Sequence, residues 1–189
     1  MRIVAGQARG RRLTVPKGRK VRPTADRVRE ALFSTIGSRV SNARVLDLFA
    51  GTGALGLEAL SRGAASAVFV EKSKSVRAIL ERNIEDLGFE SEAKVVPGDA
   101  RSALRVLEKD KAKFDVVFLD PPYAGDLLEM TLNALGAPGL LDRNAVIIAE
   151  HPRGEKPLLP KSLRIVVTKS YGGTDLSIVE HSGSRTPAR

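Results

Sequence analysis

Strand-like and helix-like segments alternate along most of the chain, and this alternation constrains the fold more than any other feature. Short runs rich in β-branched residues are followed by segments whose apolar residues recur every three or four positions. This order predicts an α/β fold with a mostly parallel sheet covered by helices on both faces. We expect strands over 44–49, 66–71, 93–97, 114–119 and 145–150, and helices over 54–62, 73–87, 100–108 and 126–136.

The pattern differs at the two ends of this alternation. Before it, we expect a helix that begins after Thr24 as its N-cap and stops at Gly37. After it, residues 163–169 and 175–180 form two β-rich runs, joined through 171–173 without a helix between them. The sheet is therefore expected to finish in an antiparallel hairpin.

Composition narrows the classes of protein that the chain can belong to. Its 189 residues suit one globular domain. The absence of cysteine excludes disulfides, thiolate zinc sites and cysteine nucleophiles. No apolar run approaches the roughly 18 residues of a membrane span, and the N-terminus lacks the apolar core of a signal peptide. We expect a soluble, cytoplasmic monomer with no metal and no membrane partner.

The net charge of +9 is concentrated at the front of the chain, where residues 1–25 hold eight basic side chains and no acidic one. Neutralised phosphates release counterions, so a basic segment on a nearly neutral body is typical of a nucleic-acid binder. A solubilising charged tail is the alternative. The candidate nucleic-acid contacts are Arg2, Arg9, Arg11, Arg12, Lys17, Arg19, Lys20, Arg22, Arg27 and Arg29.

Apolar residues are interleaved with these arginines. They flank Gly6 and Gly10, and this pattern predicts a short β-hairpin rather than a disordered arm. Nothing in the hairpin distinguishes RNA from DNA. The predicted organisation is a basic β-hairpin extension over 1–23, one folded domain over 24–181 and a disordered tail over 182–189.

Four candidate site segments follow strands, at the carboxyl ends where ligands bind to open parallel sheets. The first runs from Asp47 through Ala50, Gly51 and Gly53 into a helix. Its glycines allow a ligand to approach the backbone, and the helix N-terminus offers free N–H donors. A tight strand-to-helix turn without a ligand is the alternative.

The second and third segments contain carboxylates. Glu71 ends a strand and can accept hydrogen bonds from two ribose hydroxyls, although an ordinary solvated glutamate is the alternative. Asp99 follows the next strand and can accept a hydrogen bond from the exocyclic amine of an adenine. It can equally be a helix N-cap, a role compatible with the first. Their neighbours Lys72 and Ala100 complete the candidate cofactor set.

The fourth segment is Asp120-Pro121-Pro122-Tyr123, directly after a buried strand. Two prolines fix a rigid loop and remove two backbone donors. Asp120 and the Pro121 carbonyl can then accept hydrogen bonds from an –NH₂ group, while Tyr123 offers an aromatic face for a base. The segment predicts a site for an exocyclic amine; a plain turn or a polyproline recognition segment is the alternative.

These acids, glycines and the Asp-Pro-Pro-Tyr box occur in an order that resembles the class I S-adenosylmethionine-dependent methyltransferases, and the box resembles the subset that acts on amino groups. Segments 2–13, 22–33 and 50–60 are similar to the bacterial 16S ribosomal RNA guanine-N2 methyltransferases of the RsmD type. The similarity extends up to the C-terminal hairpin. Ser34 departs from the asparagine that family members often carry, and the tail after about 181 has no counterpart.

The resemblance implies a Rossmann-like catalytic domain that uses S-adenosyl-L-methionine, and an RNA-contacting extension. It implies that Gly51 and Gly53 pass under the methionine part of the cofactor, and that Asp47 orders this loop or the methionine amino group. It likewise implies that Glu71 holds the ribose and Asp99 the adenine. The box becomes the target-amine site, with Asp120 also beside the cofactor. The implied substrate is a guanine of 16S rRNA, presented by the 30S subunit or a late assembly intermediate.

Several other functions stay open on the residues alone. An adenine-N6 DNA methyltransferase shares the amine box but usually needs an added target-recognition region. A glutamine-amide methyltransferase leaves the basic front unexplained, and a nicotinamide-dependent dehydrogenase fits Asp47 and the acceptor-only box poorly. An rRNA-binding assembly factor without catalysis would not need the intact box. The choice of guanine N2 over adenine N6 depends on the resemblance.

Overall fold

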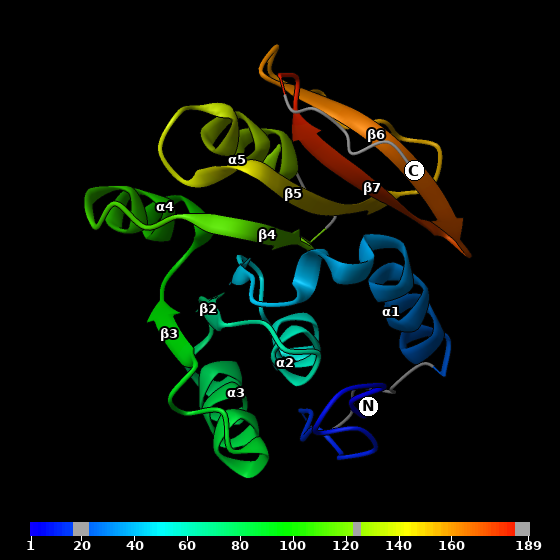
Figure 1. The fold of residues 1–189 in the computed structure, drawn as a ribbon, viewed down its shortest axis with the longest axis vertical. Coiled ribbons are helices and arrows are strands. Elements are labelled where there is room, and N and C mark those ends of the chain that lie inside the picture. The colour runs from blue at the N-terminus through cyan, green and yellow to red at the C-terminus, as the bar shows by residue number, and fades with distance from the viewer. Residues whose placement is uncertain (17–22, 123–125, 184–189) are drawn as a thin grey trace.

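The computed structural model describes residues 1–16, 23–122 and 126–183 (Figure 1). Within these ranges the strands form one seven-stranded sheet in the order β3-β2-β1-β4-β5-β7-β6. The strands are β1 (Arg44–Asp47), β2 (Ser66–Glu71), β3 (Ala93–Pro97), β4 (Phe114–Leu119), β5 (Leu141–Pro152), β6 (Leu163–Tyr171) and β7 (Thr174–His181). The helices are α1 (Pro23–Ile36), the 3-10 turn η1 (Gly37–Val40), α2 (Ala54–Ser61), α3 (Lys74–Leu87), α4 (Ala100–Lys109) and α5 (Leu127–Gly136).

The sheet is parallel from β3 to β5, and β7 runs antiparallel to both β5 and β6. This confirms the predicted parallel sheet with a C-terminal antiparallel hairpin. β5 begins at Leu141, earlier than predicted, because Leu141 pairs with Phe114 across an irregularity in the β4–β5 register. The hairpin turns at Gly172, whose φ of +60° suits glycine.

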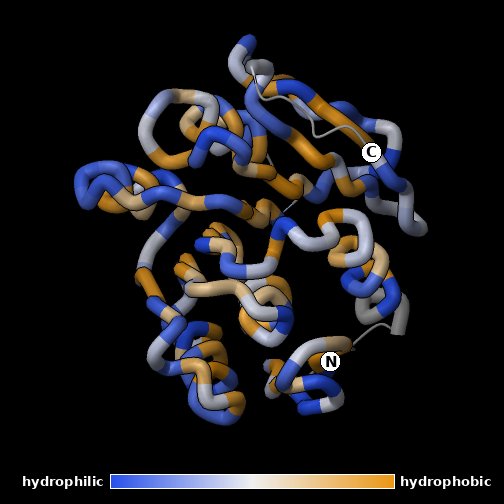
Figure 2. Tube along the Cα trace, viewed as in Figure 1, coloured by the Kyte–Doolittle hydropathy of each residue, from blue (hydrophilic) through white to orange (hydrophobic). Residues whose placement is uncertain are grey.

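Helices cover both faces of the sheet, and alternate residues of each strand belong to different cores. On one face, Phe118 packs in a cluster with residues of α1, α2 and α3. On the other, Leu119 packs with residues of α4 and α5. Figure 2 shows hydrophobic residues along the central strands, and hydrophobic residues interspersed with hydrophilic ones along α3 and α4. Among the described residues, no helix combines the length and the apolar character needed to cross a bilayer.

The start of α1 differs from the prediction. The helix begins at Pro23, before the expected N-cap Thr24. Proline is favoured in the first turn of a helix because its missing N–H would have no partner there. At the other end, the helix stops as expected before Gly37, and the chain continues into the η1 turn.

The described part of the N-terminal segment, residues 1–16, folds back on itself without forming two regular strands. One antiparallel bridge joins Arg2 to Arg12, and the backbone of Ile3 pairs with Arg11 on one side and Gly10 on the other. The predicted hairpin is therefore reduced to a single bridged loop. Ile3, with Ala8 and Leu13, is buried in the core that α1, α2 and α3 share, so the segment is packed into the domain.

Several predictions fall at or beyond the limits of the described chain. Ser182, the first residue of the predicted disordered tail, donates hydrogen bonds to the carbonyl oxygens of Ser162 (2.8 Å) and Lys161 (2.9 Å). The chain therefore keeps defined contacts past the predicted boundary. Residues 184–189 lie outside the described residues, as do Tyr123, Lys17, Arg19, Lys20 and Arg22.

Candidate active site

The glycine-rich loop between β1 and α2 lies at the carboxyl end of the sheet. Its backbone is fixed to the neighbouring strands, since Leu48 N–H donates to the Phe118 carbonyl and Ala50 N–H to that of Val70. Gly51 has a φ of +54°, and a Cβ there would meet only the Phe49 carbonyl, at 4.0 Å. This backbone is therefore open to the close approach of a ligand.

Gly53 has a different reason to be glycine. It caps α2 with a φ of +89°, and a Cβ at this position would lie 2.5 Å from Cδ1 of Leu80. Any side chain would be strained by the backbone angle and would collide with α3. The predicted tight turn and the predicted ligand loop thus coexist in one segment, with the turn at Gly53 and the open backbone at Gly51.

Asp47 is buried beneath this loop, with 2% of its surface exposed. Its Oδ2 accepts a hydrogen bond of 3.1 Å from the backbone N–H of Gly56 in α2. Burial raises the pKa of Asp47 to about 7, although hydrogen bonds from Gly56 and Phe49 oppose the shift. These contacts support the loop-ordering role, since the carboxylate points into the protein toward α2.

Glu71 is not simply solvated. Its Oε2 accepts a hydrogen bond of 3.0 Å from Gly51 N–H, and its Oε1 accepts one of 2.7 Å from Ser73 N–H. The side chain is half-buried, so it is fixed against the glycine loop while part of it stays accessible. A carboxylate oxygen can accept further hydrogen bonds, which leaves Glu71 able to bind hydroxyl groups.

Asp99 is the N-cap of α4, as the structural alternative predicted. It accepts hydrogen bonds from the backbone N–H and the hydroxyl of Ser102, both at 3.0 Å, and these hold the pKa of Asp99 below its usual range. The Gly98 N–H donates to the Glu71 carbonyl, so the ends of β2 and β3 are joined. Glu71 and Asp99 therefore follow adjacent strands, as an adenosine-binding pair requires.

Asp120 and its prolines follow β4 at the same end of the sheet. Asp120 and Pro122 are exposed, whereas Pro121 is buried. Asp120 lines a cavity of about 570 Å³ together with Ala54 and Leu55, the first residues of α2. The cavity thus connects the start of the helix after the glycine loop with the candidate amine box. The other described lining residues are Met1, Val28, Arg29, Leu32, Leu119, Ile148, Glu150, Tyr171, Gly172, Gly173, Thr174 and Leu176.

Of the residues that line this cavity, the sequence analysis named only Arg29 and Asp120 as site residues, and Glu150, Tyr171 and Met1 are among those it missed. Glu150 lies near the end of β5, and Tyr171 ends β6. The signal for Glu150 was present, because the segment VIIAE ends a buried strand on an acid as VFVE does at Glu71. Met1 gave no such signal, because its position depends on the folding of residues 1–16 onto the domain.

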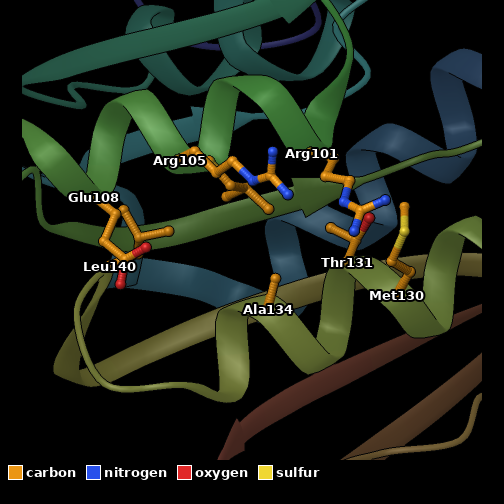
Figure 3. A pocket seen from close by; sticks show the side chains of 8 residues that line it. Arg101, Arg105, Glu108, Met130, Thr131, Ala134 and Leu140 are labelled. Atoms are coloured by element: carbon orange, nitrogen blue, oxygen red, sulfur yellow. The ribbon is translucent and has the colours of Figure 1, made fainter.

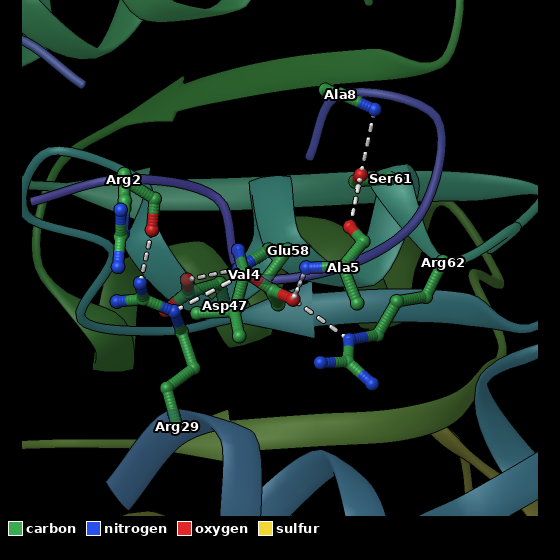
Figure 4. Close-up of polar contacts among 10 residues, drawn as sticks. Arg2, Val4, Ala5, Ala8, Arg29, Asp47, Glu58, Ser61 and Arg62 are labelled. Atoms are coloured by element: carbon green, nitrogen blue, oxygen red, sulfur yellow. Dashed lines mark hydrogen bonds and ion pairs between the residues drawn. The ribbon is translucent and has the colours of Figure 1, made fainter. Parts of the chain in front are cut away.

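Glu58, in the middle of α2, anchors the N-terminal segment (Figure 4). Its fully buried carboxylate accepts hydrogen bonds from the backbone N–H groups of Val4 (2.8 Å) and Ala5 (3.0 Å). It also accepts from the guanidinium Nε atoms of Arg29 (3.3 Å) and Arg62 (2.7 Å). One buried negative charge therefore has four donors, two of them cationic.

The position of Arg29 corrects the prediction that it belongs to the exposed basic surface. Only 4% of its side chain is exposed, because it is paired with Glu58 and donates to the carbonyl oxygen of Arg2. It faces the cavity instead of the solvent. Among the predicted nucleic-acid contacts that the structure describes, Arg2, Arg9, Arg11, Arg12 and Arg27 are exposed.

Ser61 fixes the same segment one turn further along α2. Its hydroxyl donates to the Ala5 carbonyl (2.6 Å) and accepts from Ala8 N–H (3.0 Å), as Figure 4 shows. Gly6 passes so close that a Cβ would lie 1.7 Å from the Ser61 carbonyl oxygen. Only glycine fits at this contact.

Asn83, on α3, joins the N-terminal segment to the glycine loop. Its Oδ1 accepts from Thr14 N–H at 2.8 Å, and its Nδ2 donates to the carbonyl oxygens of Thr14 (3.0 Å) and Thr52 (2.9 Å). Thr52 lies between the two glycines of the loop. A single buried amide therefore contacts both the basic segment and the candidate cofactor loop.

A second cavity, of about 250 Å³, lies between α4 and α5 (Figure 3). Arg101 and Arg105 extend from α4 toward α5, where Met130 and Thr131 line the opposite side. None of the residues that line this second cavity belongs to the candidate site, although Arg101 directly follows Asp99 and Ala100 in the sequence.

Comparisons with known proteins agree on one family. The family model described as "Conserved hypothetical protein 95" matches residues 1–180. Ribosomal RNA small subunit methyltransferase D of Escherichia coli is 44% identical over 150 residues, which cover 79% of this chain and 74% of that protein. The protein of the same name from Haemophilus influenzae is 36% identical over 172 residues, 91% and 89% of the two chains. The solved structure of yhhF from E. coli superposes with a TM-score of 0.86 at 39% identity, over 98% and 99%.

Proposed function

Because the chain belongs to the RsmD-type family of S-adenosylmethionine-dependent methyltransferases, we propose that it methylates the exocyclic N2 amine of a guanine in 16S ribosomal RNA. The proposed form of the substrate is the small ribosomal subunit or a late assembly intermediate. The relatives in E. coli and H. influenzae, both small-subunit ribosomal RNA methyltransferases, support this class of substrate.

The cavity beside Asp120 is the observation that carries the proposal. It is lined on one side by the start of α2, directly after the glycine loop, and on another by Asp120 at the end of β4. A methyl donor bound over the loop and an amine bound at Asp120 would therefore meet in one space. Holding two reactants in this way accounts for much of the rate of a transfer reaction.

The residues present fit the cofactor. The backbone at Gly51 is open, Glu71 is held half-buried against it, and Asp99 follows the adjacent strand. In the proposal, Glu71 binds the ribose hydroxyls and Asp99 the adenine amine, while Asp47 keeps the loop in shape from below. When bound, S-adenosylmethionine supplies an electrophilic methyl group, because an amine lone pair can attack its carbon and displace the sulfonium sulfur as a neutral thioether.

Asp120 and the Pro121 carbonyl are proposed to prepare the nucleophile. The lone pair of a purine amine is delocalised into the ring, which makes it a poor nucleophile. When each of these two acceptors receives a hydrogen bond from one N–H of the amine, the nitrogen is drawn toward a tetrahedral geometry. Its lone pair is then free to form the N–C bond. The leaving thioether would keep the electron pair of the C–S bond, and Asp120 would take one amine proton and pass it to solvent. The acceptors act mainly through position and fixed charge.

The exposed arginines of the N-terminal segment are proposed to bind the RNA backbone. Arg9 and Arg12 are exposed on the bridged loop, and Met1 from the same segment lines the cavity. Phosphate contacts on this loop would hold the RNA beside the cavity, while the target base leaves its stack to enter it.

Methyl transfer to different nucleic acids tests the function. Labelled S-adenosylmethionine is supplied with 30S particles lacking the modification, naked 16S rRNA and duplex DNA, and the products are digested to nucleosides. We expect label in N2-methylguanosine from the particle. Label in N6-methyladenine from DNA would instead identify a DNA methyltransferase. Cofactor binding with no label in any nucleic acid would also contradict the proposal.

A further inference from the structure

We propose that Glu150 selects guanine over adenine by accepting a hydrogen bond from the N1–H of the target base. This inference rests on the proposed function, and it supplies the distinction between guanine N2 and adenine N6 that Asp120 and the Pro121 carbonyl cannot make. Those two acceptors can bind the –NH₂ group of either purine. A further group must therefore read the atom next to the amine.

Strand register places Glu150 beside Asp120. β4 and β5 are parallel neighbours in which Leu119 pairs with Ala149, so Asp120 and Glu150 are the next residues after this pair. Adjacent strands lie about 4.8 Å apart, and paired residues of parallel strands face the same side. Both acids line the same cavity. Two carboxylates thus lie next to each other where the reacting base is expected.

The edge of guanine suits two adjacent carboxylates. Its N1–H and N2 amine are bonded to the same ring carbon and are both donors, whereas an ionised carboxylate only accepts. With the amine at Asp120, the N1–H is in reach of the neighbouring acid. Adenine presents the bare N1 lone pair beside its amine, and this lone pair would be repelled by a carboxylate.

The charge on the rest of the cavity agrees with this orientation. Among the described lining residues, the charged side chains are Arg29, Asp120 and Glu150. Arg29 is held in place by its ion pair with Glu58, at 3.3 Å. This ion pair compensates the charge of Arg29, so the base edge is read by the two carboxylates, which match the two adjacent donors of guanine.

Base analogues test the proposed contact. 2,6-Diaminopurine keeps the amine on C2 but has a bare N1 and an amine in place of O6, so it retains the nucleophile and loses the N1–H. 6-Thioguanine keeps the C2 amine and the N1–H and changes only O6, so it controls for the second change. Small subunits are reconstituted with 16S rRNA ligated to carry guanine, 2,6-diaminopurine or 6-thioguanine at the methylated position. We expect kcat/KM of the unmodified enzyme to fall by about 100-fold or more with 2,6-diaminopurine, because a site built around a donor rejects bases that lack it.

The variant Glu150→Gln completes the cycle. It should lower kcat/KM on guanine by no more than about 10-fold, because the amide oxygen still accepts from the N1–H but without the charge of the carboxylate. A further change to 2,6-diaminopurine should cost less than about 3-fold, since the amide NH₂ can donate to a bare N1. Glu85→Gln is the matched control, because Glu85 is exposed on α3 and lies outside this cavity. This control should keep the kcat/KM values of the unmodified enzyme on guanine and on 2,6-diaminopurine. Binding of S-adenosylhomocysteine and the melting temperature check that each variant is folded.

The outcomes separate the two proposals. Equal rates of the unmodified enzyme on guanine and 2,6-diaminopurine would overturn the role of Glu150 while N2 methylation stands. Discrimination against 2,6-diaminopurine by Glu150→Gln as strong as that by the unmodified enzyme would also overturn the role of Glu150, and N2 methylation would again stand. No methylation of the guanine particle by the unmodified enzyme would overturn both. If Glu150→Gln does not fold, the unmodified enzyme should still methylate 6-thioguanine much faster than 2,6-diaminopurine. Equal losses on both analogues would overturn the reading of N1–H.

Discussion

Glu58 and Arg29 form an ion pair in which both side chains are almost completely buried, with Oε2 3.3 Å from Nε. The pair connects α2 with α1 and lies directly beneath the backbone of Val4 and Ala5. A buried charge of this kind is tolerated only while its partners remain in place.

Replacing Glu58 by Gln should therefore destabilise the protein strongly. The change leaves Arg29 buried without its counter-charge, and breaking such a pair costs about 3 to 5 kcal/mol. Urea unfolding of the variant measures the loss, and limited proteolysis should show earlier cleavage within residues 1–16. Glu85→Gln, on the exposed side of α3, is the control and should unfold like the original protein. A stability loss under about 1 kcal/mol would contradict the proposed anchoring.

Asn83 should affect both stability and cofactor binding. Asn83→Ala leaves the backbone groups of Thr14 and the carbonyl of Thr52 without their side-chain partner, which should cost about 2 to 4 kcal/mol. Because Thr52 belongs to the glycine loop, affinity for S-adenosylhomocysteine, measured by calorimetry, should fall several-fold. Asn133→Ala, at an exposed position of α5, should change neither quantity. Unaltered affinity in folded Asn83→Ala would show that the loop does not need this support.

Asp120→Ala should separate catalysis from cofactor binding. Loss of one acceptor aimed at the reacting amine should lower turnover by about 10²- to 10³-fold, while the dissociation constant for S-adenosylhomocysteine should stay within about 2-fold, since the loop and Glu71 are untouched. Asp110→Ala, at the exposed C-terminal end of α4, provides a matched removal of a carboxylate. Retained turnover in Asp120→Ala would remove this residue from the mechanism.

Asp47 predicts a defined dependence of stability on pH. Burial raises its pKa from 3.8 to about 7, so the folded state holds a proton that the unfolded state has already released. Its contribution is fully present below about pH 4 and is lost as the pH rises through about 7. The free energy of unfolding of Asp47→Asn should not decline in this way. The difference in unfolding free energy between the variant and the original protein should therefore grow from pH 4 to pH 7. A constant difference across this range would refute a raised pKa.

The basic loop should be tested by charge substitution. Deleting residues 1–22, the obvious change from sequence, would also remove Ile3 and Leu13 from the core. Arg9→Gln with Arg12→Gln should instead reduce the slope of log affinity against log salt by up to about 2 for rRNA binding. Lys109→Gln with Lys111→Gln, after α4, is the control and should keep the slope. Equal slopes for both pairs would exclude Arg9 and Arg12 as phosphate contacts.

The sheet and most of the loop geometry could be predicted because their signals are local. The run VFVE predicts β2 and places Glu71 at its end, and Asp99 before an apolar periodic segment predicts both a strand end and an N-cap. Each depends on residues within a few positions. Their side-by-side position then follows from the rules of parallel sheets.

The parts that could not be predicted depend on distant partners. Arg29 continued a basic run, and only the fold shows that Glu58 neutralises it and removes it from solvent. Asp120 and Glu150 are separated in sequence by α5 but are neighbours because β4 pairs with β5. No local pattern contains either relationship, so the burial of Arg29 and the position of Glu150 beside Asp120 had to come from the structure.

The docking of the first residues has a consequence for biosynthesis. Their partners are Glu58, Ser61 and Asn83, which the ribosome adds long after Ile3 and Leu13 have been made. Until α2 and α3 emerge, the growing chain carries these apolar side chains uncovered. Such delayed long-range contacts slow folding and leave a nascent protein open to aggregation. Residues 1–16 are thus synthesised before α2 and α3 but reach their final place only after them.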